Sequence, residues 1–461
     1  MSSKPEPRVM IVALIVAGAL FMQMLDATII VTAIPAMALS FGVTPLTMGA
    51  GITAYMLTVA ILIPAAGWLA DRIGARSVFL VAIVVFTIGS LLCGLSVDLP
   101  QFVAARIVQG AGGAFMVPVG QVIVLRLAKR SELVRALSLL SWPALFAPVL
   151  GPTIGGLITT YISWRWTFLI NIPVGLLCFA LTAYLIPDDG YRIKIPLDWR
   201  SLLLSSLGLG VLLAGLDGLV HHGANFVFSI IHIAAGASLC ALATFCIRRA
   251  KHPLLDLSIL SVRTFALSNL LAGSYYRIAL NTTPFLLPLL FQLGFGLNAF
   301  QAGSLMVAYF GGNLGVRVIT TPVLERLGFR HVMVANGILS AIAIGLCILL
   351  SADTPVPLVI TLMVLGGATR SMQYTALNVL AFIDIKPDQR SAASTLSTML
   401  MQITILLGVV FGSISLSAFQ SIRGDPNLDL IDFQLSFGLL AIVTLVSAIQ
   451  MRGIPPSVKS R

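Results

Sequence analysis

The feature of this sequence that most constrains its fold is a series of fourteen apolar segments separated by short polar connections. They lie at approximately 9–38, 47–69, 77–95, 100–125, 134–160, 165–186, 200–220, 226–247, 264–292, 300–323, 331–351, 356–383, 392–418 and 433–451. A helix needs about 20 apolar residues to cross a bilayer. Backbone groups in lipid must satisfy their hydrogen bonds within the protein, and a helix does so. The sequence therefore predicts an all-α membrane protein with fourteen transmembrane helices.

The composition supports the same conclusion. Hydrophobic residues make up 58% of the chain, charged residues 10%, and the mean hydropathy is +1.01. A soluble chain of 461 residues would have no way to hide so much apolar surface. The net charge of +11 falls on short loops, which favours lipid headgroups over nucleic acid as the partner. The five cysteines have no paired spacing and are expected to be small core residues.

The basic residues predict how the chain is threaded through the membrane. Of the 28 Lys and Arg residues, 22 fall on one side of the fourteen-helix arrangement. Only Arg165 and Arg423 fall on the other side. Short cytoplasmic loops carry an excess of Lys and Arg, so both termini are predicted to be cytoplasmic. Four basic residues remain within the membrane, namely Arg106, Arg277, Arg317 and Arg370.

An internal repeat indicates how the chain is organised. GWLADRIGAR at 67–76 joins the second and third helices, and TPVLERLGFR at 321–330 joins the tenth and eleventh. Each loop therefore follows the second helix of a six-helix half, and both are predicted on the inner side. Such duplicated halves are typical of secondary transporters. The predicted domains are a six-helix bundle at 1–187, a two-helix insert at 188–262, and a second six-helix bundle at 263–461.

Four motifs give the chain a family resemblance. The loop motif has Gly67, Leu69, Ala70, Asp71, Arg72, Gly74 and Arg76, and the fourth-helix motif has Arg106, Gln109, Gly110, Gly112 and Ala114. The fifth-helix motif has Gly151, Pro152, Gly155 and Gly156, and the first-helix motif has Leu25, Asp26, Thr28, Ala33 and Pro35. Together they resemble the major facilitator superfamily, in its fourteen-helix drug/proton antiporter branch and near the MdtD and HsrA group. Three positions depart from the motifs: Ala75 replaces a basic residue, Ala147 a glycine and Val31 an asparagine.

The resemblance implies a proton-coupled antiporter that exports amphipathic drugs or small metabolites by alternating access. It implies a monomer in the bacterial inner membrane, with protons, a small-molecule substrate and lipid as partners, and no cofactor. Two alternatives remain open. Four intramembrane arginines favour an exporter of anionic metabolites or of metal–organic acid complexes, and a substrate sensor would use the same fold without net transport.

Asp26 is the candidate proton-carrying residue, because an intramembrane carboxylate is costly and is by default a functional hypothesis. Burial favours the neutral form of a carboxyl group and a nearby arginine favours the ionised form. Arg106 and Gln109 on the fourth helix are the predicted partners of Asp26. A structural role for Asp26 or for Arg106 is the alternative.

The two loops of the repeat are predicted to form a cytoplasmic latch, a two-state element that opens and closes the inner gate. Its members are Gly67, Asp71, Arg72, Gly74, Arg76, Glu325, Arg326 and Arg330. The alternative is that these charges only anchor turns at the headgroups. The fifth-helix residues Gly151, Pro152, Gly155 and Gly156 are predicted to pack helices closely, since small residues permit close approach.

Two polar groupings in the second half are the candidate substrate site. One is formed by Tyr275, Tyr276, Arg277 and Asn281, and the other by Arg370, Gln373 and Asn378. Arg317 is expected to reach inward toward the membrane surface.

No catalytic or metal-binding constellation is present. GAGG at 110–113 lies on a membrane helix and not after a strand, and the sequence has no Gly-Lys pair for a nucleotide-binding loop. His221 and His222 share an outer loop without a group of carboxylates, so no metal site is expected. The sequence predicts a protein that is not an enzyme.

Overall fold

The computed structural model describes residues 7–128, 133–188, 190–192, 196, 198–219, 226–250, 255–386, 389–425 and 427–454. Every regular element within those residues is helical, and each of the fourteen predicted spans coincides with a helix or a short run of helices. The predicted all-α fold is confirmed. His221, His222 and seven of the predicted cytoplasmic basic residues lie outside the described residues: Lys4, Lys129, Arg130, Lys194, Lys251, Lys459 and Arg461.

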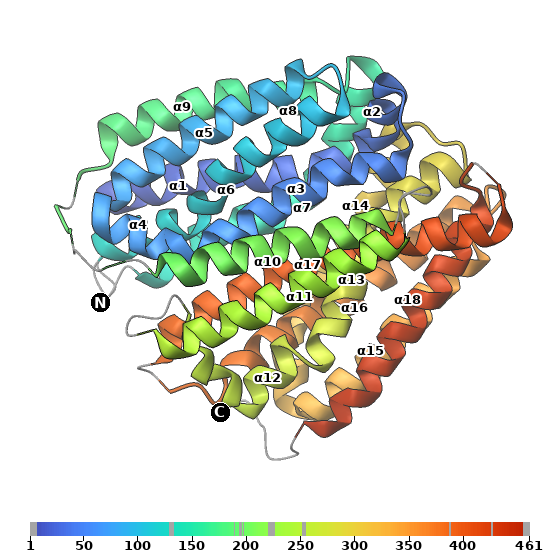
Figure 1. Ribbon diagram of the computed structural model, residues 1–461. Helices are drawn as coiled ribbons and strands as arrows, with labels where there is room; N and C mark the ends of the chain where they lie inside the picture. The colour runs from blue at the N-terminus through green and yellow to red at the C-terminus, as the bar shows by residue number, and fades with distance from the viewer. Residues whose placement is uncertain are drawn as a thin grey trace. The chain divides into compact units, whose positions relative to one another are not determined.

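The first six spans form a series of long helices, some of them interrupted (Figure 1). Their bounds are α1 Pro7–Ile29, η1 Ile30–Ala33, α2 Ile34–Phe41, α3 Pro45–Leu62, η2 Ile63–Ala65, α4 Ala66–Ile73, α5 Ala75–Leu95, α6 Leu99–Leu127, α7 Leu133–Tyr161, α8 Trp166–Leu169 and α9 Asn171–Leu185. The insert consists of α10 Trp199–Gly218 and α11 Phe226–Arg249.

The last six spans repeat this plan. Their bounds are η3 Leu257–Ser261, α12 Arg263–Asn269, α13 Ala272–Leu289, η4 Leu290–Gly294, α14 Ala299–Leu327, α15 Phe329–Leu346, η5 Cys347–Leu349, α16 Val356–Phe382, α17 Arg390–Arg423, α18 Leu430–Gln450 and η7 Met451–Gly453. Prolines account for several interruptions, because a proline lacks the N–H of a helical hydrogen bond. Pro35 follows the 3-10 turn η1, Pro64 lies within η2, and Pro288 precedes the π-helical turn η4.

The chain forms two compact units. The first contains the described residues up to Gly210 together with Ala237–Cys246, and the second contains Val211–Gly236 and the described residues from Leu255 onward. The boundary between the units therefore falls within α10 and again within α11. The three-part division with an insert at 188–262 stays a prediction.

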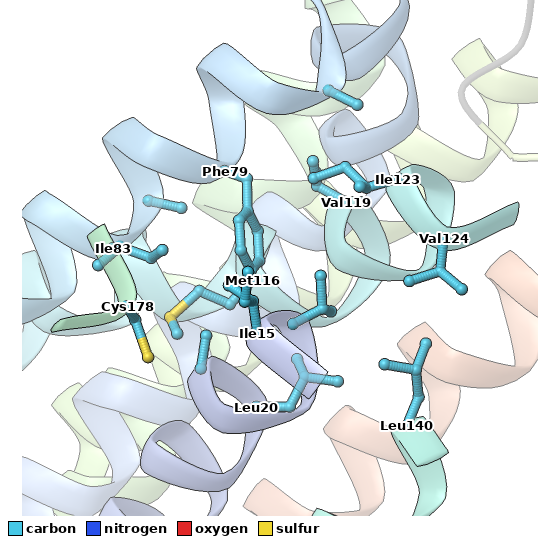
Figure 2. Packing of buried hydrophobic residues seen from close by; sticks show 14 of the residues in the cluster. Ile15, Leu20, Phe79, Ile83, Met116, Val119, Ile123, Val124, Leu140 and Cys178 are labelled. Atoms are coloured by element: carbon cyan, nitrogen blue, oxygen red, sulfur yellow. The ribbon is translucent and has the colours of Figure 1, made fainter. Parts of the chain in front are cut away.

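The core of the first unit is formed mainly by α1, α5 and α6, with further buried residues from α3, α4, α7 and α9. Figure 2 shows Phe79 of α5 pointing toward Met116 of α6, with Ile15 of α1 and Cys178 of α9 close by. All of these side chains are buried. No water-exclusion force acts between helices in lipid, so close packing of this kind is what holds them together.

Ten helices within the described residues are long and apolar enough to span a bilayer. In α7 the apolar stretch within the described residues is the shorter segment Leu145–Tyr161. Three further predicted spans are not among the ten: α13, α14 and α16. These three carry the intramembrane arginines of the second half, Arg277, Arg317 and Arg370. The polarity of these helices is therefore a property of the second unit.

Candidate functional site

The carboxylate of Asp26 lies at the centre of a buried hydrogen-bond network in the first unit. Its side chain is fully buried on α1. Arg106 of α6 forms an ion pair with it, with 2.8 Å between Nη1 and Oδ2. Oδ1 accepts a hydrogen bond of 2.8 Å from the amide of Gln109 and one of 2.7 Å from the amide of Asn171. We refer to Asp26, Arg106, Gln109, Asn171 and Ser90 as the Asp26 network.

Helix spacing explains why Arg106 and Gln109 act together. Residues three apart on a helix point to the same side, so both side chains of α6 reach α1. Asn171 is the first residue of α9, which follows the short helix α8. Ser90 of α5 accepts hydrogen bonds from Gln109 (2.8 Å) and from Asn171 (3.2 Å) and thereby holds the two amides in position. Four helices thus contribute a side chain to the Asp26 network.

Arg106 has further acceptors besides Asp26. Its Nη1 also donates to the side-chain oxygen of Gln109, and its Nε donates to the backbone oxygen of Gly51, 3.3 Å away on α3. The guanidinium carbon lies 4.2 Å from the centre of the Tyr55 ring, within the range of a cation–π interaction. Arg106 would therefore keep favourable contacts if Asp26 became neutral.

Sequence reasoning identified Asp26, Arg106 and Gln109 but missed Asn171 and Ser90. The structure brings the first three residues together as predicted, and the other two complete the network. Asn171 follows no motif, although a single amide at the start of an apolar segment was a signal. Ser90 had no signal, because a serine on a membrane helix most often bonds its own backbone; it does so here with Phe86.

The glycines of α7 bring that helix into close contact with α1. A Cβ atom on Gly151 would lie 2.1 Å from the Thr28 hydroxyl, and one on Gly155 would lie 2.4 Å from the backbone oxygen of Ile29. Thr28 also donates a hydrogen bond of 3.2 Å to the backbone oxygen of Ala147. Pro152 and Gly156 are buried on the same helix. The four predicted packing residues thus lie on a helix that touches α1 next to Asp26.

The first copy of the repeated loop carries an ion pair. Asp71 pairs with Arg126 at the end of α6, and Arg76 donates a hydrogen bond to the backbone oxygen of Ala183. Gly74 has a φ of 103°, a value that favours glycine. Arg72 lies over the ring of Trp68, and Gly67 has open space around it.

The chain after α9 folds back onto this loop. The Arg126 guanidinium lies 4.4 Å from the centre of the Tyr191 ring, and a Cβ atom on Gly74 would meet the guanidinium of Arg192 at 2.2 Å. Arg192 also forms an ion pair of 2.9 Å with Asp188, which lowers the pKa of that carboxyl group below its usual value. The linker to α10 therefore contributes to the charge grouping around Asp71.

The second copy of the loop is more open. Glu325 and Arg326 are exposed at the end of α14, and Gly328 has a φ of 77° with open space around it. Arg330 lies partly buried in the first turn of α15. The latch role of the eight predicted residues stays a prediction.

In the second unit, Arg277 of α13 and Asn378 of α16 meet. Nη2 of Arg277 donates a hydrogen bond of 3.0 Å to the Asn378 side-chain oxygen, and its guanidinium carbon lies 5.3 Å from the centre of the Tyr374 ring. Arg277 is 1% exposed. Asn281 follows one helical turn later, and its amide nitrogen is buried without a hydrogen-bond partner.

The other predicted substrate residues are distributed around this pair. Arg370 donates a hydrogen bond of 2.7 Å to the backbone oxygen of Leu280. Gln373 faces α15, where it bonds Asn336 and the backbone of Met333. Tyr276 is buried and Tyr275 is exposed. Residues two apart lie on different sides of a helix, so Tyr275 and Arg277 do not converge on one site.

Two further features of the second unit are an exposed arginine and an apolar crevice. Arg317 is exposed on α14, and its reach toward the membrane surface stays a prediction. A narrow apolar crevice is lined by Leu280, Thr283, Leu287, Tyr309, Ser340, Ala343, Ile344, Cys347, Leu362, Met363 and Gly366. Its lining carries no charged residue, and it touches α13 on the Leu280 side.

Comparison with known proteins identifies the family. The model of the Major Facilitator Superfamily matches residues 16–294 and 269–461. A protein of Cronobacter sakazakii described as "Putative multidrug resistance protein MdtD" is 38% identical over 410 residues, covering 88% of this chain and 86% of the relative. The protein of the same description from Escherichia coli strain K12 is 35% identical over 451 residues, covering 96% and 94%.

Solved structures agree on the fold. The POT family transporter PepTSo matches with a TM-score of 0.70 at 12% identity, covering 97% of both chains. A D-xylose-proton symporter matches with a TM-score of 0.69 at 14% identity, covering 97% of this chain and 98% of that one. The human organic anion transporter MFSD10 matches with a TM-score of 0.61 at 15% identity. At such identities the likeness concerns the fold alone.

Fold and relatives together define a multi-pass membrane transporter of small molecules. The chain belongs to the Major Facilitator Superfamily, and within it to the group of MdtD-like proteins. The family resemblance in the motifs is thereby confirmed.

Proposed function

We propose that this protein is a proton-coupled antiporter that exports small amphipathic molecules, with Asp26 as the proton-carrying residue. The observation that carries the proposal is the Asp26 network, a fully buried carboxylate that accepts from three side chains of two other helices. Export as the direction of transport is supported by the name of the relatives, which are described as multidrug resistance proteins.

Three donors on two other helices surround the carboxylate of Asp26 in this conformation: Arg106 and Gln109 of α6 and Asn171 of α9. The side chain is fully buried, so a proton from water reaches it only when the network opens. A conformational change that opens the network to water would supply that step.

Arg106 limits the cost of protonating Asp26. An isolated buried arginine would be strongly unfavourable. Arg106 keeps the oxygens of Gln109 and Gly51 as acceptors and the Tyr55 ring as a neighbour, whether Asp26 is charged or neutral. The network can therefore gain and lose one proton while the guanidinium keeps hydrogen-bond acceptors in both states.

Transport has a proposed orientation. The 22 basic residues on one side of the predicted spans support a cytoplasmic location for both termini. Export then moves substrate away from the side that holds the two repeated loops, while protons enter in the opposite direction.

The test is a flux measurement in proteoliposomes with an imposed proton gradient. Asp26→Asn should abolish gradient-driven efflux, because an amide cannot release a proton. Asp98→Asn is the matched control. Asp98 is the N-cap of α6, and an asparagine caps a helix equally well. Gradient-driven flux in Asp26→Asn equal to that of the wild type would remove Asp26 from the mechanism.

A further inference from the structure

Arg277 is a buried cation, and most of its N–H groups have no hydrogen-bond acceptor among the described residues. A guanidinium has five N–H groups. Among the described residues, Nη2 has Asn378 as an acceptor, while Nε and Nη1 are buried without a partner. Three of the five N–H groups therefore lack an acceptor. An unsatisfied buried donor is costly, and more so when it is charged.

The positive charge of Arg277 also has no carboxylate partner among the described residues. No ion pair joins Arg277 to a carboxylate of the described residues. The ion pairs of Arg423 with Asp425 and Asp432 lie at the other end of the unit's helices, between the end of α17 and the start of α18. The Tyr374 ring covers one side of the guanidinium but accepts none of the in-plane N–H groups.

A second donor without an acceptor lies one turn along α13. The amide nitrogen of Asn281 is buried and unbonded, and residues four apart share a helix face. Asn281 lies against α17, because a Cβ atom on Gly408 would meet the Cβ of Asn281 at 2.8 Å. Two unsatisfied donor groups thus lie on the same face of one helix.

The first unit shows that the fold does not require this arrangement. Four pairs of similar residues, one from each half, are separated by the same number of positions and thereby set the register between the halves. They are Gly42 and Gly296, Thr44 and Asn298, Tyr55 and Tyr309, and Asp71 and Glu325. In that register Arg277 corresponds to Gln23, and Leu280 corresponds to Asp26. The second unit has an arginine in place of a neutral amide and lacks the carboxylate that neutralises Arg106 in the first.

We propose that Arg277 and Asn281 form a binding site for an anionic group, and that the substrates of the transporter are amphipathic molecules carrying one carboxylate. This inference deepens the proposed function and, for the identity of the substrate, rests on it. A carboxylate offers acceptors for the free N–H groups and cancels the buried charge. The Tyr374 ring, whose centre lies 5.3 Å from the guanidinium carbon, offers an apolar surface for a body attached to that carboxylate.

The anion has two possible sources, a substrate carboxylate or a small inorganic anion such as chloride. Both offer what Arg277 lacks, and only the carboxylate is planar like the guanidinium. Benzoate, benzamide and chloride are therefore suitable probes. Benzamide has nearly the shape of benzoate without its charge.

The experiment measures equilibrium binding to the purified full-length protein in lipid nanodiscs, without a proton gradient. For the wild type we expect benzoate to bind at least tenfold more tightly than benzamide. Arg277→Gln should abolish that preference, and Arg277→Lys should retain part of it. Arg317→Gln, which removes an exposed arginine of α14, is the matched control and should bind like the wild type. Asn281→Ala, which keeps the guanidinium, should weaken benzoate about two- to tenfold.

Each outcome decides one part of the proposal. Competition by chloride that depends on Arg277 would support the anion site and overturn the carboxylate as its occupant. Equal binding of benzoate and benzamide, or an unchanged preference in Arg277→Gln, would overturn the site. If Arg277→Gln fails to fold, unchanged benzoate binding in Asn281→Ala would overturn it instead. Binding should persist in Asp26→Asn, so a failure of proton coupling and a failure of the anion site are distinguishable.

Discussion

The two units handle buried charge in opposite ways. In the first unit, the cation Arg106 is paired with Asp26, and the side chains around the pair satisfy one another. In the second unit, the cation Arg277 is equally buried, but the position that corresponds to Asp26 holds Leu280. A duplicated scaffold can thus keep its packing while its halves carry different charged groups. In the functions proposed above, the first half binds a proton and the second half binds an anion.

The scaffold itself is retained between the units. Thr28 donates to the backbone of α7, and Thr282, at the corresponding position of α13, donates a hydrogen bond of 2.8 Å to the backbone oxygen of Gly408 on α17. Tyr55 and Tyr309 each lie beside an arginine of the fourth helix of their unit, Arg106 and Arg370. The units therefore differ in their charged groups more than in their packing.

The largest expected effect comes from giving the second unit a carboxylate of its own. Leu280→Asp places an acceptor one turn from Arg277, because residues three apart share a helix face. The new carboxylate should occupy the anion site from within and lower benzoate affinity at least tenfold, as measured by equilibrium binding. Leu280→Asn, which has the same shape without charge, is the control. Unchanged benzoate binding in Leu280→Asp would argue that Arg277 is not the anion-binding residue.

A second prediction compares how tightly the units are packed. Gly155→Ala should destabilise the protein by about 1–3 kcal/mol, because the added methyl group meets the backbone oxygen of Ile29 at 2.4 Å. Gly412→Ala on α17 should cost less, because its nearest neighbour is the Phe285 side chain at 2.9 Å, which can move. Thermal unfolding of the two variants measures the difference. Equal losses would mean that α7 can shift away from α1.

The smallest expected effect separates a network member from a structural amide. Asn171→Ala removes one of the three donors to Asp26, and Asn336→Ala removes the donor to Gln373 in the second unit. Each should lower stability by about 1–2 kcal/mol, since each variant loses two side-chain hydrogen bonds. Only Asn171→Ala should also slow gradient-driven flux in proteoliposomes. Slower flux in both variants, or in neither, would show that the two amides have equivalent roles.

Much of the fold was predictable from the sequence because the length and hydropathy of its apolar segments identify membrane helices. Asp26 and Arg106 were predictable as partners because each is costly alone in a membrane. Asn171 was not, since hydropathy does not report how α9 is rotated about its axis or that its first turn faces α1. The same limit applies to Tyr275 and Gln373, which lie close to Arg277 and Arg370 in sequence but face other directions.

The contact between α1 and α7 has a mechanical consequence for the transporter. Gly151 lies against the Thr28 side chain and Gly155 against the backbone of Ile29, and the Thr28 hydroxyl donates a hydrogen bond to α7 beside Asp26. We therefore expect α1 and α7 to move together as one rigid body when Asp26 becomes exposed to water. The resistance to that movement comes from the amide and guanidinium contacts of α5, α6 and α9. In the proposed transport cycle, water replaces these contacts when Asp26 is exposed, and the contacts form again when the network closes.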